Sequence, residues 1–335
     1  MNDTCKMAAD RVQCCCIGFS LIDDHLFALI PGPYGSNVKK EALMNPYVFM
    51  TDSDSDLPFS YVDELDLSMV YMPYIVNGKE FMDDLGRSGG QKEYFDNMRA
   101  GAAPSTSLLP MGAYLDIFEP ILAEGKDILF IAFSSQLSGT MNNARNAAEE
   151  LLEKYPERKI LIVDTLSIAA PQSILVLKAY ELYRQGKSME EVAQWVEDNK
   201  MRAQAWFTVD DLKYLRRGGR ISTVAAVAGT LLDLKPIITE NREGKLVSTD
   251  KVRGRKSALR LIADKAAENI DDPANAMPVI MHADAPEDAQ RLEKLLRERV
   301  PELPQIQIWY VGPVIGAHCG PGTVAVCYFG KERPH

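Results

Sequence analysis

The sequence lacks an excess of positive charge and lacks long apolar runs. It contains 37 lysines and arginines against 47 aspartates and glutamates, for a formal net charge of −10 at pH 7. Binding to the phosphates of nucleic acid needs a basic surface, so we expect no nucleic-acid partner. No apolar stretch reaches the roughly 20 residues that cross a bilayer, so no membrane-spanning segment is expected. The apolar stretch 12–22 loosely resembles part of a signal peptide, but Asp23 and Asp24 follow it without a small-residue cleavage site, and export is not expected.

Cysteines are few, and their spacing does not suit a disulfide framework or a zinc site. Three of the six, Cys14, Cys15 and Cys16, are adjacent in the chain and cannot all turn toward one metal ion in regular structure. The paired C-x-x-C spacing of a zinc site is missing. We therefore expect free thiols in a reducing cytoplasm, and we expect no metal.

Several catalytic fingerprints are also missing from the sequence. There is no G-x-S-x-G, and the glycines of 217–220 and 316–322 lack the spacing of a phosphate-binding or dinucleotide-binding loop. Residue types that could form a hydrolase triad are nevertheless present, namely Ser134 or Ser138, His282 or His318, and Asp52 or Asp164. A serine esterase or acyltransferase therefore stays open as an alternative function.

The composition is that of an ordinary globular protein with room for two domains. The chain has 335 residues, of which 46% are hydrophobic and 25% charged. Residues 1–43 end in a Pro/Gly-rich loop and a charged stretch, so we expect a poorly ordered extension, with Met44 as a candidate start. We place an N-terminal α/β domain at 44–203 and a C-terminal α+β domain at 204–335.

The first of these domains shows apolar strands that alternate with helices. Strands are expected at 47–50, 69–76, 128–133 and 160–163, with Asn77 and Gly78 as a turn, and helices at 114–122, 139–152 and 168–185. Strands that are apolar throughout predict a parallel sheet covered on both faces, which is a three-layer α/β fold. The loops at Asp52, Ser134 and Asp164 each follow a strand, so they are expected at one edge of the sheet, where ligands bind.

The composition changes near Arg202. Strands are expected at 206–209, 235–239, 245–250, 278–282, 305–311 and 323–329, with helices at 211–216, 256–269 and 286–300. A helix at 222–232 is rich in small residues and lacks charges, so we expect it to be buried or to line an apolar cavity.

Three polar clusters stand where an apolar segment meets a helix, at 105–107, 134–140 and 216–222. Hydroxyls and free backbone N–H groups at a helix start bind carboxylate or phosphate well, although each cluster alone is explained equally by helix capping. His318 lies among glycines and is expected in a loop that lets the backbone approach a ligand. The acidic loop 51–56 lacks the glycine and glutamate positions of a calcium loop, so it predicts capping or a site-forming turn.

The order of these motifs resembles the DegV family from about Tyr47 to the C-terminus. The residues that carry the resemblance are 51–53, 56–58, 106–107, 134–135, 137–140, 163–164, 212–222, 251–256, 282–284 and 312–318. The resemblance implies an EDD/DegV-like α/β domain, a C-terminal α+β domain, and a fatty acid bound between them. Relatives of this kind present the ligand carboxylate to a separate ATP-using kinase, which makes an acyl phosphate for phospholipid synthesis.

By motif, the resemblance implies a head-group site formed by Thr106, Ser107, Ser134, Ser135 and His318. Arg253 matches an arginine associated with kinase interaction. The chain departs from the family in one loop, where Leu108-Leu109-Pro110 stands in place of the usual Gln-Pro after Thr-Ser, and Ser105 is a competing hydroxyl. The arginines of 216–220 are expected near the cavity mouth or a partner surface.

The resemblance therefore implies a cytoplasmic, lipid-binding, non-catalytic subunit without a cofactor, whose partners are a long-chain fatty acid and the fatty acid kinase catalytic protein. Each buried methylene contributes about 0.8 kcal/mol, or roughly 12 kcal/mol for about 16 carbons before ordering costs. The tail then provides affinity and the hydroxyls provide orientation. A lipid-binding regulator without kinase coupling stays open, as does a transient contact with a membrane.

Overall fold

The computed structural model describes residues 46–220 and 234–334, which belong to one compact unit, Lys40–His335. The expectations for residues 1–43 and for a helix at 222–232 lie outside the described residues. Within the described ranges, no helix combines the length and apolar character that crossing a membrane requires.

The first sheet has four parallel strands in the order β2-β1-β6-β7. Their bounds are Ser68–Val70 for β2, Tyr47–Asp52 for β1, Asp127–Ala132 for β6 and Ile160–Asp164 for β7. In the register of β1, Thr51 pairs with Met69 of β2 and with Ile131 of β6. The polar residues that follow β1, β6 and β7 therefore lie at one edge of this sheet.

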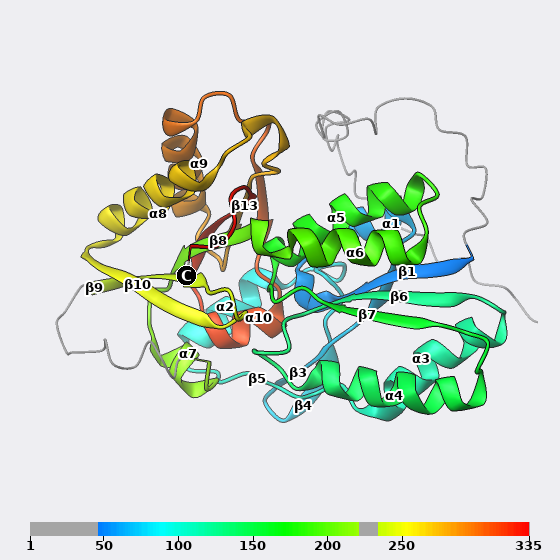
Figure 1. The fold of residues 1–335 in the computed structure, drawn as a ribbon. Helices are drawn as coiled ribbons and strands as arrows, with labels where there is room; N and C mark the ends of the chain where they lie inside the picture. Colours follow the sequence, from blue (N-terminus) through cyan, green and yellow to red (C-terminus); the bar gives the residue numbers. More distant parts are fainter. Residues whose placement is uncertain (1–45, 221–233, 335) are drawn as a thin grey trace, which may run out of the picture. The chain divides into compact units, whose positions relative to one another are not determined.

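Helices cover both faces of this parallel sheet (Figure 1). Alternate strand residues, such as Ile128 and Phe130, pack against α3 (Met111–Ala123) and α4 (Thr140–Lys154). The intervening ones, such as Leu129 and Ile131, pack toward α5 (Ala170–Arg184) and α6 (Met189–Asn199). Since successive side chains of a strand point to opposite faces, both faces are apolar and both need a cover. The predicted three-layer α/β architecture is confirmed.

A small antiparallel sheet, β4-β3-β5, corrects one predicted strand. The stretch 69–76 is split: β2 ends at Val70, and β3 (Pro73–Val76) pairs instead with β4 (Lys79–Met82) and β5 (Ser105–Thr106). Pro73 has no N–H for a central ladder, and the N–H of Met72 donates to Ser53 Oγ at 2.9 Å, which takes the chain away from the parallel sheet. The expected turn at Asn77 and Gly78 is present, and both residues have positive φ.

The third sheet has six strands in the order β10-β9-β8-β13-β11-β12. The bounds in chain order are Ala203–Thr208 (β8), Leu234–Glu240 (β9), Leu246–Arg253 (β10), Val279–His282 (β11), Gln307–Tyr310 (β12) and Val324–Phe329 (β13). The pairings are antiparallel except for β11 with β12. The helices α8 (Arg255–Asn269) and α9 (Pro286–Arg299) pack on one face, so this part is α+β as predicted.

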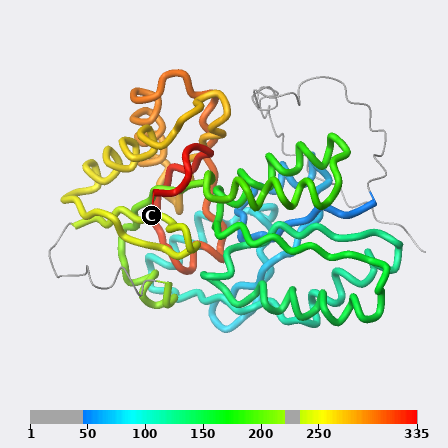
Figure 2. Tube along the Cα trace, in the orientation of Figure 1, coloured from blue at the N-terminus to red at the C-terminus, as the bar shows by residue number. Residues whose placement is uncertain are grey.

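The opposite face of the six-stranded sheet shares a hydrophobic core with the first sheet. Ala205 and Cys327, which pair across β8 and β13, belong to the same buried cluster as Leu129 and Ile174. The C-terminal segment also returns to the start of β8 (Figure 2). There the N–H of Gly330 donates to the carbonyl of Arg202 at 2.9 Å. The predicted boundary at 203/204 falls at the start of β8, and a division into two domains stays a prediction.

Shorter helices connect these layers. They are α1 (Phe59–Leu65), α2 (Gln91–Arg99), α7 (Lys213–Arg217) and α10 (Pro313–Cys319), together with the 3-10 turns η1 (Ser53–Ser55), η2 (Lys200–Arg202) and η4 (Pro273–Asn275). The prediction of a loop around His318 is wrong, because that residue lies in the last turn of α10. Pro313 fits the first helical turn, where its missing N–H has no partner to lose.

Candidate functional site

A cavity of about 250 Å³ lies between the parallel sheet and the six-stranded sheet. Of the 26 described residues that line it, 18 are apolar. They come from both sides: Phe133 and Leu137 follow β6, Ala169 precedes α5, and Phe207 and Ala325 lie on the six-stranded sheet. A mostly apolar cavity with a few polar groups is the ordinary form of a small-molecule site.

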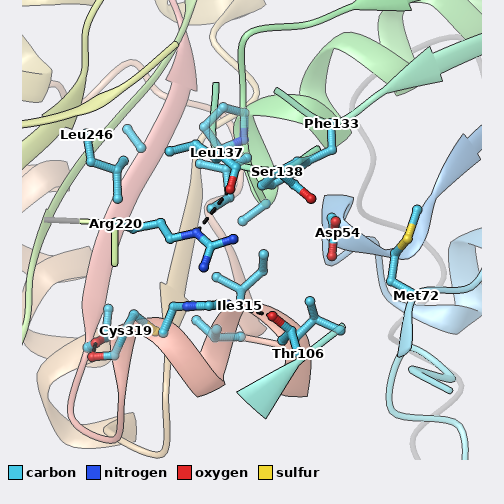
Figure 3. Close-up of a pocket in the computed structure, with 18 of the residues that line it drawn as sticks. Asp54, Met72, Thr106, Phe133, Leu137, Ser138, Arg220, Leu246, Ile315 and Cys319 are labelled. Carbon is cyan, nitrogen blue, oxygen red and sulfur yellow. Dashed lines mark hydrogen bonds between the residues drawn. The ribbon is translucent and has the colours of Figure 1, made fainter. Parts of the chain in front are cut away.

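Thr106 and His318 meet at the wall of this cavity (Figure 3). Thr106 Oγ1 of β5 and His318 Nε2 of α10 are 2.9 Å apart, and His318 Nδ1 is buried without a hydrogen-bond partner among the described residues. Burial, and then the charges of Arg220 and Arg217, lower the pKa of His318 to about 4. The imidazole is therefore neutral near pH 7, and it offers one donor and one acceptor.

The other predicted head-group residues divide into two sets. Ser107 lines the cavity, and its hydroxyl donates to Glu80 Oε2 at 3.2 Å. Ser134 is fully buried outside the lining, where its hydroxyl donates to the Gly244 carbonyl at 3.0 Å. Ser135 also lies outside the lining, and its N–H donates to Asp164 Oδ1 at 3.3 Å. The structure thus brings Thr106, Ser107 and His318 together at the cavity, and it does not place Ser134 or Ser135 there.

The cluster 134–140 contributes two hydroxyls to the cavity that the family resemblance did not single out. Ser138 and Thr140 both line it, and their hydroxyl oxygens are 2.8 Å apart. The N–H of Thr140 donates to Ser138 Oγ at 3.2 Å, at the start of α4. The sequence indicates both residues as candidates, because they lie at the start of an expected helix within the polar cluster 134–140.

Arg220 is a half-buried residue of the cavity lining. Its Nε donates to the Leu137 carbonyl at 3.0 Å and its Nη1 donates to the Gly218 carbonyl. Figure 3 shows the guanidinium projecting among the lining side chains. The Leu137 carbonyl lies 83 residues from Arg220 in the sequence, so no local pattern indicated this contact. A fixed cation in an apolar cavity attracts an anionic head group.

Four buried aspartates include one that lines the cavity. Asp52, Asp54, Asp56 and Asp83 are buried, and Asp54 lines the cavity. Burial raises the pKa of Asp52 to about 6, against hydrogen bonds from Phe133 N–H and Gln172 Nε2. The acidic loop is thus a buried turn, and among the described residues no group of three or more His, Cys, Asp or Glu side chains is arranged to hold a metal ion.

The hydrogen bonds of the candidate triad residues do not match a hydrolase. The Ser134 hydroxyl donates to Gly244, and that of Ser138 pairs with Thr140. His318 pairs with Thr106, while His282 Nδ1 accepts from the N–H of Ala285 at 3.3 Å. Within 46–220 and 234–334, neither serine contacts a histidine, which a nucleophile and its base require.

Arg253, the residue implied in kinase contact, lies apart from these groups. It is the last residue of β10, it is exposed, and it does not line the cavity.

The fold and the cavity define a class: α/β proteins with a mostly apolar cavity between a parallel and a mixed sheet. The model of the DegV family matches residues 48–331 of this chain. A DegV domain-containing protein of Clostridium perfringens, CPE0026, is 40% identical over 290 residues, which are 87% of this chain and 99% of that protein. The chain belongs to the DegV family.

Two solved structures are similar over nearly the whole described chain. A DegV family protein from Thermus thermophilus, described for its fatty acid binding, is 30% identical with a TM-score of 0.74, covering 85% of this chain and 99% of that one. The fatty acid binding DegV family protein SAG1342 from Streptococcus agalactiae is 28% identical with a TM-score of 0.75, again covering 85% and 99%.

Proposed function

We propose that this protein binds a long-chain fatty acid in the cavity between its two sheets. The acyl chain lies against the apolar wall, and the carboxylate lies at Thr106, Ser107 and His318. The observation that carries the proposal is the apolar cavity, in which 18 of the 26 described lining residues are apolar and a threonine–histidine pair faces the same space. The fatty acid binding of two relatives of known structure supports it.

The remaining polar lining residues complete the proposed head-group site. From the cluster 134–140 we favour Ser138 and Thr140, which face the cavity, over Ser134 and Ser135, which do not line it. Arg220 contributes positive charge, but its Nε and Nη1 already donate to carbonyls. The guanidinium therefore cannot clamp both carboxylate oxygens through those two atoms, and the oxygens stay accessible to a reacting partner.

Native mass spectrometry of the purified protein tests this function. Under conditions that keep noncovalent lipids bound, we expect a mass increment equal to one fatty acid. Replacing Thr106 by valine removes one hydroxyl without changing the side-chain shape, so fatty acid affinity should fall about three- to tenfold. Thr249→Val, on β10 outside the cavity lining, is the matched control and should bind like the wild type. A protein that carries no lipid and binds no added fatty acid would contradict the proposal.

We also propose that the bound acid is presented to a separate ATP-dependent kinase, which forms the acyl phosphate for phospholipid synthesis, and that this chain is not catalytic alone. Arg253 is the proposed kinase contact, because it is exposed at the end of β10 and leaves the cavity untouched. Presentation is supported by the neutral hydroxyls of the head-group site, which can orient a carboxylate through hydrogen bonds.

Arg253→Glu separates kinase contact from ligand binding. We expect fatty acid affinity to stay at the wild-type value, while acyl phosphate formation with the cognate kinase and ATP falls at least about tenfold, because a reversed charge opposes its partner. Lys294→Ala on α9 is the control for an exposed cation elsewhere, and it should leave acyl phosphate formation unchanged. Normal acyl phosphate formation by the Arg253→Glu variant would show that Arg253 does not contribute to kinase contact. Fatty acid binding without any acyl phosphate formation by the wild type would favour a lipid-binding regulator.

A further inference from the structure

Asp54 is held rigidly at the wall of the cavity. It is the middle residue of η1, directly after β1, and its carbonyl accepts from the N–H of Ala169 at 2.9 Å. The serines on either side are engaged with the protein, since Ser53 Oγ accepts from Met72 N–H and the Ser55 hydroxyl donates to the Asp52 carbonyl. Asp54 alone of these three lines the cavity (Figure 3).

The carboxyl of Asp54 lacks the donors that hold the carboxyl of Asp52. The two residues are nearly inaccessible to solvent, since Asp54 is 5% exposed and Asp52 is 1% exposed. Asp52 accepts from Phe133 N–H at 2.9 Å and from Gln172 Nε2 at 3.0 Å. Asp54 Oδ1 has no hydrogen-bond partner among the described residues. A buried carboxyl oxygen without a partner is costly, and the place of Asp54 at the cavity lets a bound molecule supply the partner of Oδ1.

The charges around Asp54 favour its acid form. Among the described residues, the ionisable groups that face it or share its cavity wall are Asp52, Asp56, Asp83, Tyr114, Arg220, His318, Cys319 and Cys327. Burial, and then Asp52 and Asp83, raise the pKa of Asp54 well above its ordinary value, and Arg220 opposes them. His318 is neutral near pH 7, so Arg220 is the positive charge of this group.

We propose that the carboxylic acid of Asp54 donates a hydrogen bond to the carboxylate of the bound fatty acid, so that the two acids share one proton. This inference rests on the proposed function. Two ionised carboxylates in one apolar site repel each other strongly, whereas an acid and a carboxylate form a short, strong hydrogen bond. The single negative charge of the pair is then balanced by Arg220.

A shared proton makes fatty acid affinity depend on pH. Below the pKa of Asp54 the proton is already present, and affinity is constant. Above that pKa, binding must take up a proton, so affinity falls by up to about tenfold per pH unit. A fatty alcohol carries no charge, and its hydroxyl can donate to an ionised Asp54, so its affinity should not fall in this way.

The experiment measures the dissociation constants of hexadecanoic acid and hexadecan-1-ol from about pH 6.5 to about pH 9.5. Asp54→Asn keeps a neutral donor and should bind the acid with little pH dependence. Asp54→Leu removes the donor and should bind the acid about 10- to 100-fold more weakly than the wild type at the lower pH. A weaker dependence of acid affinity on pH that remains in Asp54→Asn comes from other titrating groups. One such group is Asp83, whose pKa is raised by burial to about 7.

Binding of the alcohol by both variants shows that the cavity is intact. The proposal is overturned if Asp54→Asn keeps the wild-type pH slope for the acid, or if Asp54→Leu binds the acid as tightly as the wild type. In both cases fatty acid binding itself stands. If the wild type binds the alcohol but no acid at any pH, the proposed function fails, and this inference fails with it.

Discussion

Gly218 fixes the position of the His318 imidazole. A Cβ atom at this position would lie 2.1 Å from His318 Nδ1, so the ring packs directly on the bare backbone at the end of α7. The backbone of Gly218 is ordinary, with φ of −72°, so alanine would be tolerated there by the chain itself. The conflict is therefore with the histidine ring alone.

Gly218→Ala should displace the ring and break its hydrogen bond to Thr106 Oγ1. We expect fatty acid affinity to fall about three- to tenfold, which corresponds to one lost hydrogen bond, with little change in the thermal midpoint. Gly112→Ala in α3 is the matched control, because its added Cβ meets open space. Equal affinities for the two variants would show that the ring position does not matter for binding.

Buried charged residues were hard to predict because their partners are distant in the sequence. Thr106, Ser107 and His318 were selected through the family resemblance, and the structure places all three at the cavity. Arg220 was expected near the cavity mouth or a partner surface, and the contact of its Nε with the carbonyl of Leu137, 83 residues away, was not expected. The Asp52 carboxyl accepts from Phe133, 81 residues away, so local sequence could not show that the acidic turn is buried.

At the scale of elements, apolar strands were predicted most accurately. The expected strand 128–133 corresponds to β6, and 160–163 to β7, because strands buried on both faces are unbroken apolar runs. β4 was missed since all four of its residues, Lys79–Met82, are exposed and its sequence does not alternate between apolar and polar residues. Its hydrogen bonds to β3, rather than an apolar pattern, make it a strand.

The helix α10 was missed because tertiary packing decides its conformation. It has only seven residues, and Gly316 lowers its intrinsic helix propensity. A Cβ at Gly316 would lie 2.9 Å from the Phe95 ring, so the glycine allows α10 to approach α2 closely. This close approach orients the helix whose last turn carries His318, and a sequence pattern read locally does not contain it.

At the scale of the whole molecule, Arg333 near the C-terminus connects the six-stranded sheet to the loop that follows β7 of the parallel sheet. This residue is 1% exposed, its Nε donates to the Ala203 carbonyl at 3.0 Å, and its Nη1 donates to the Leu166 carbonyl at 2.7 Å. Nη2 lies 3.6 Å from Glu240 Oε2, close enough for an ion pair but too long for a hydrogen bond. Burial raises the pKa of Glu240 to about 7, although Arg333 opposes the rise.

Arg333→Met should therefore destabilise the protein in a pH-dependent way. Between the ordinary pKa of Glu240 and its folded value, the native state binds more protons than the unfolded state, so the free energy of unfolding falls as pH rises. Loss of the guanidinium raises the pKa of Glu240 further and extends this fall to higher pH. We expect a loss of about 3–5 kcal/mol near pH 8 and a smaller loss near pH 5, measured by urea unfolding.

The control for this prediction is the double variant Arg333→Met with Glu240→Gln. Glutamine cannot ionise, so the extra pH dependence should disappear while the loss of the Arg333 hydrogen bonds remains. If both variants lose the same free energy at both pH values, Glu240 is not coupled to Arg333.

The shared walls of the cavity also bear on how long the protein survives in a cell. Residues of both sheets line the space, so only the folded chain can hold a ligand there. A ligand that binds the native state alone raises the free energy of unfolding, by about 2.7 kcal/mol when its free concentration is 100 times the dissociation constant. Degradation that proceeds through the unfolded chain would then slow as lipid becomes plentiful. The abundance of the protein would follow the supply of its ligand without any change in gene expression.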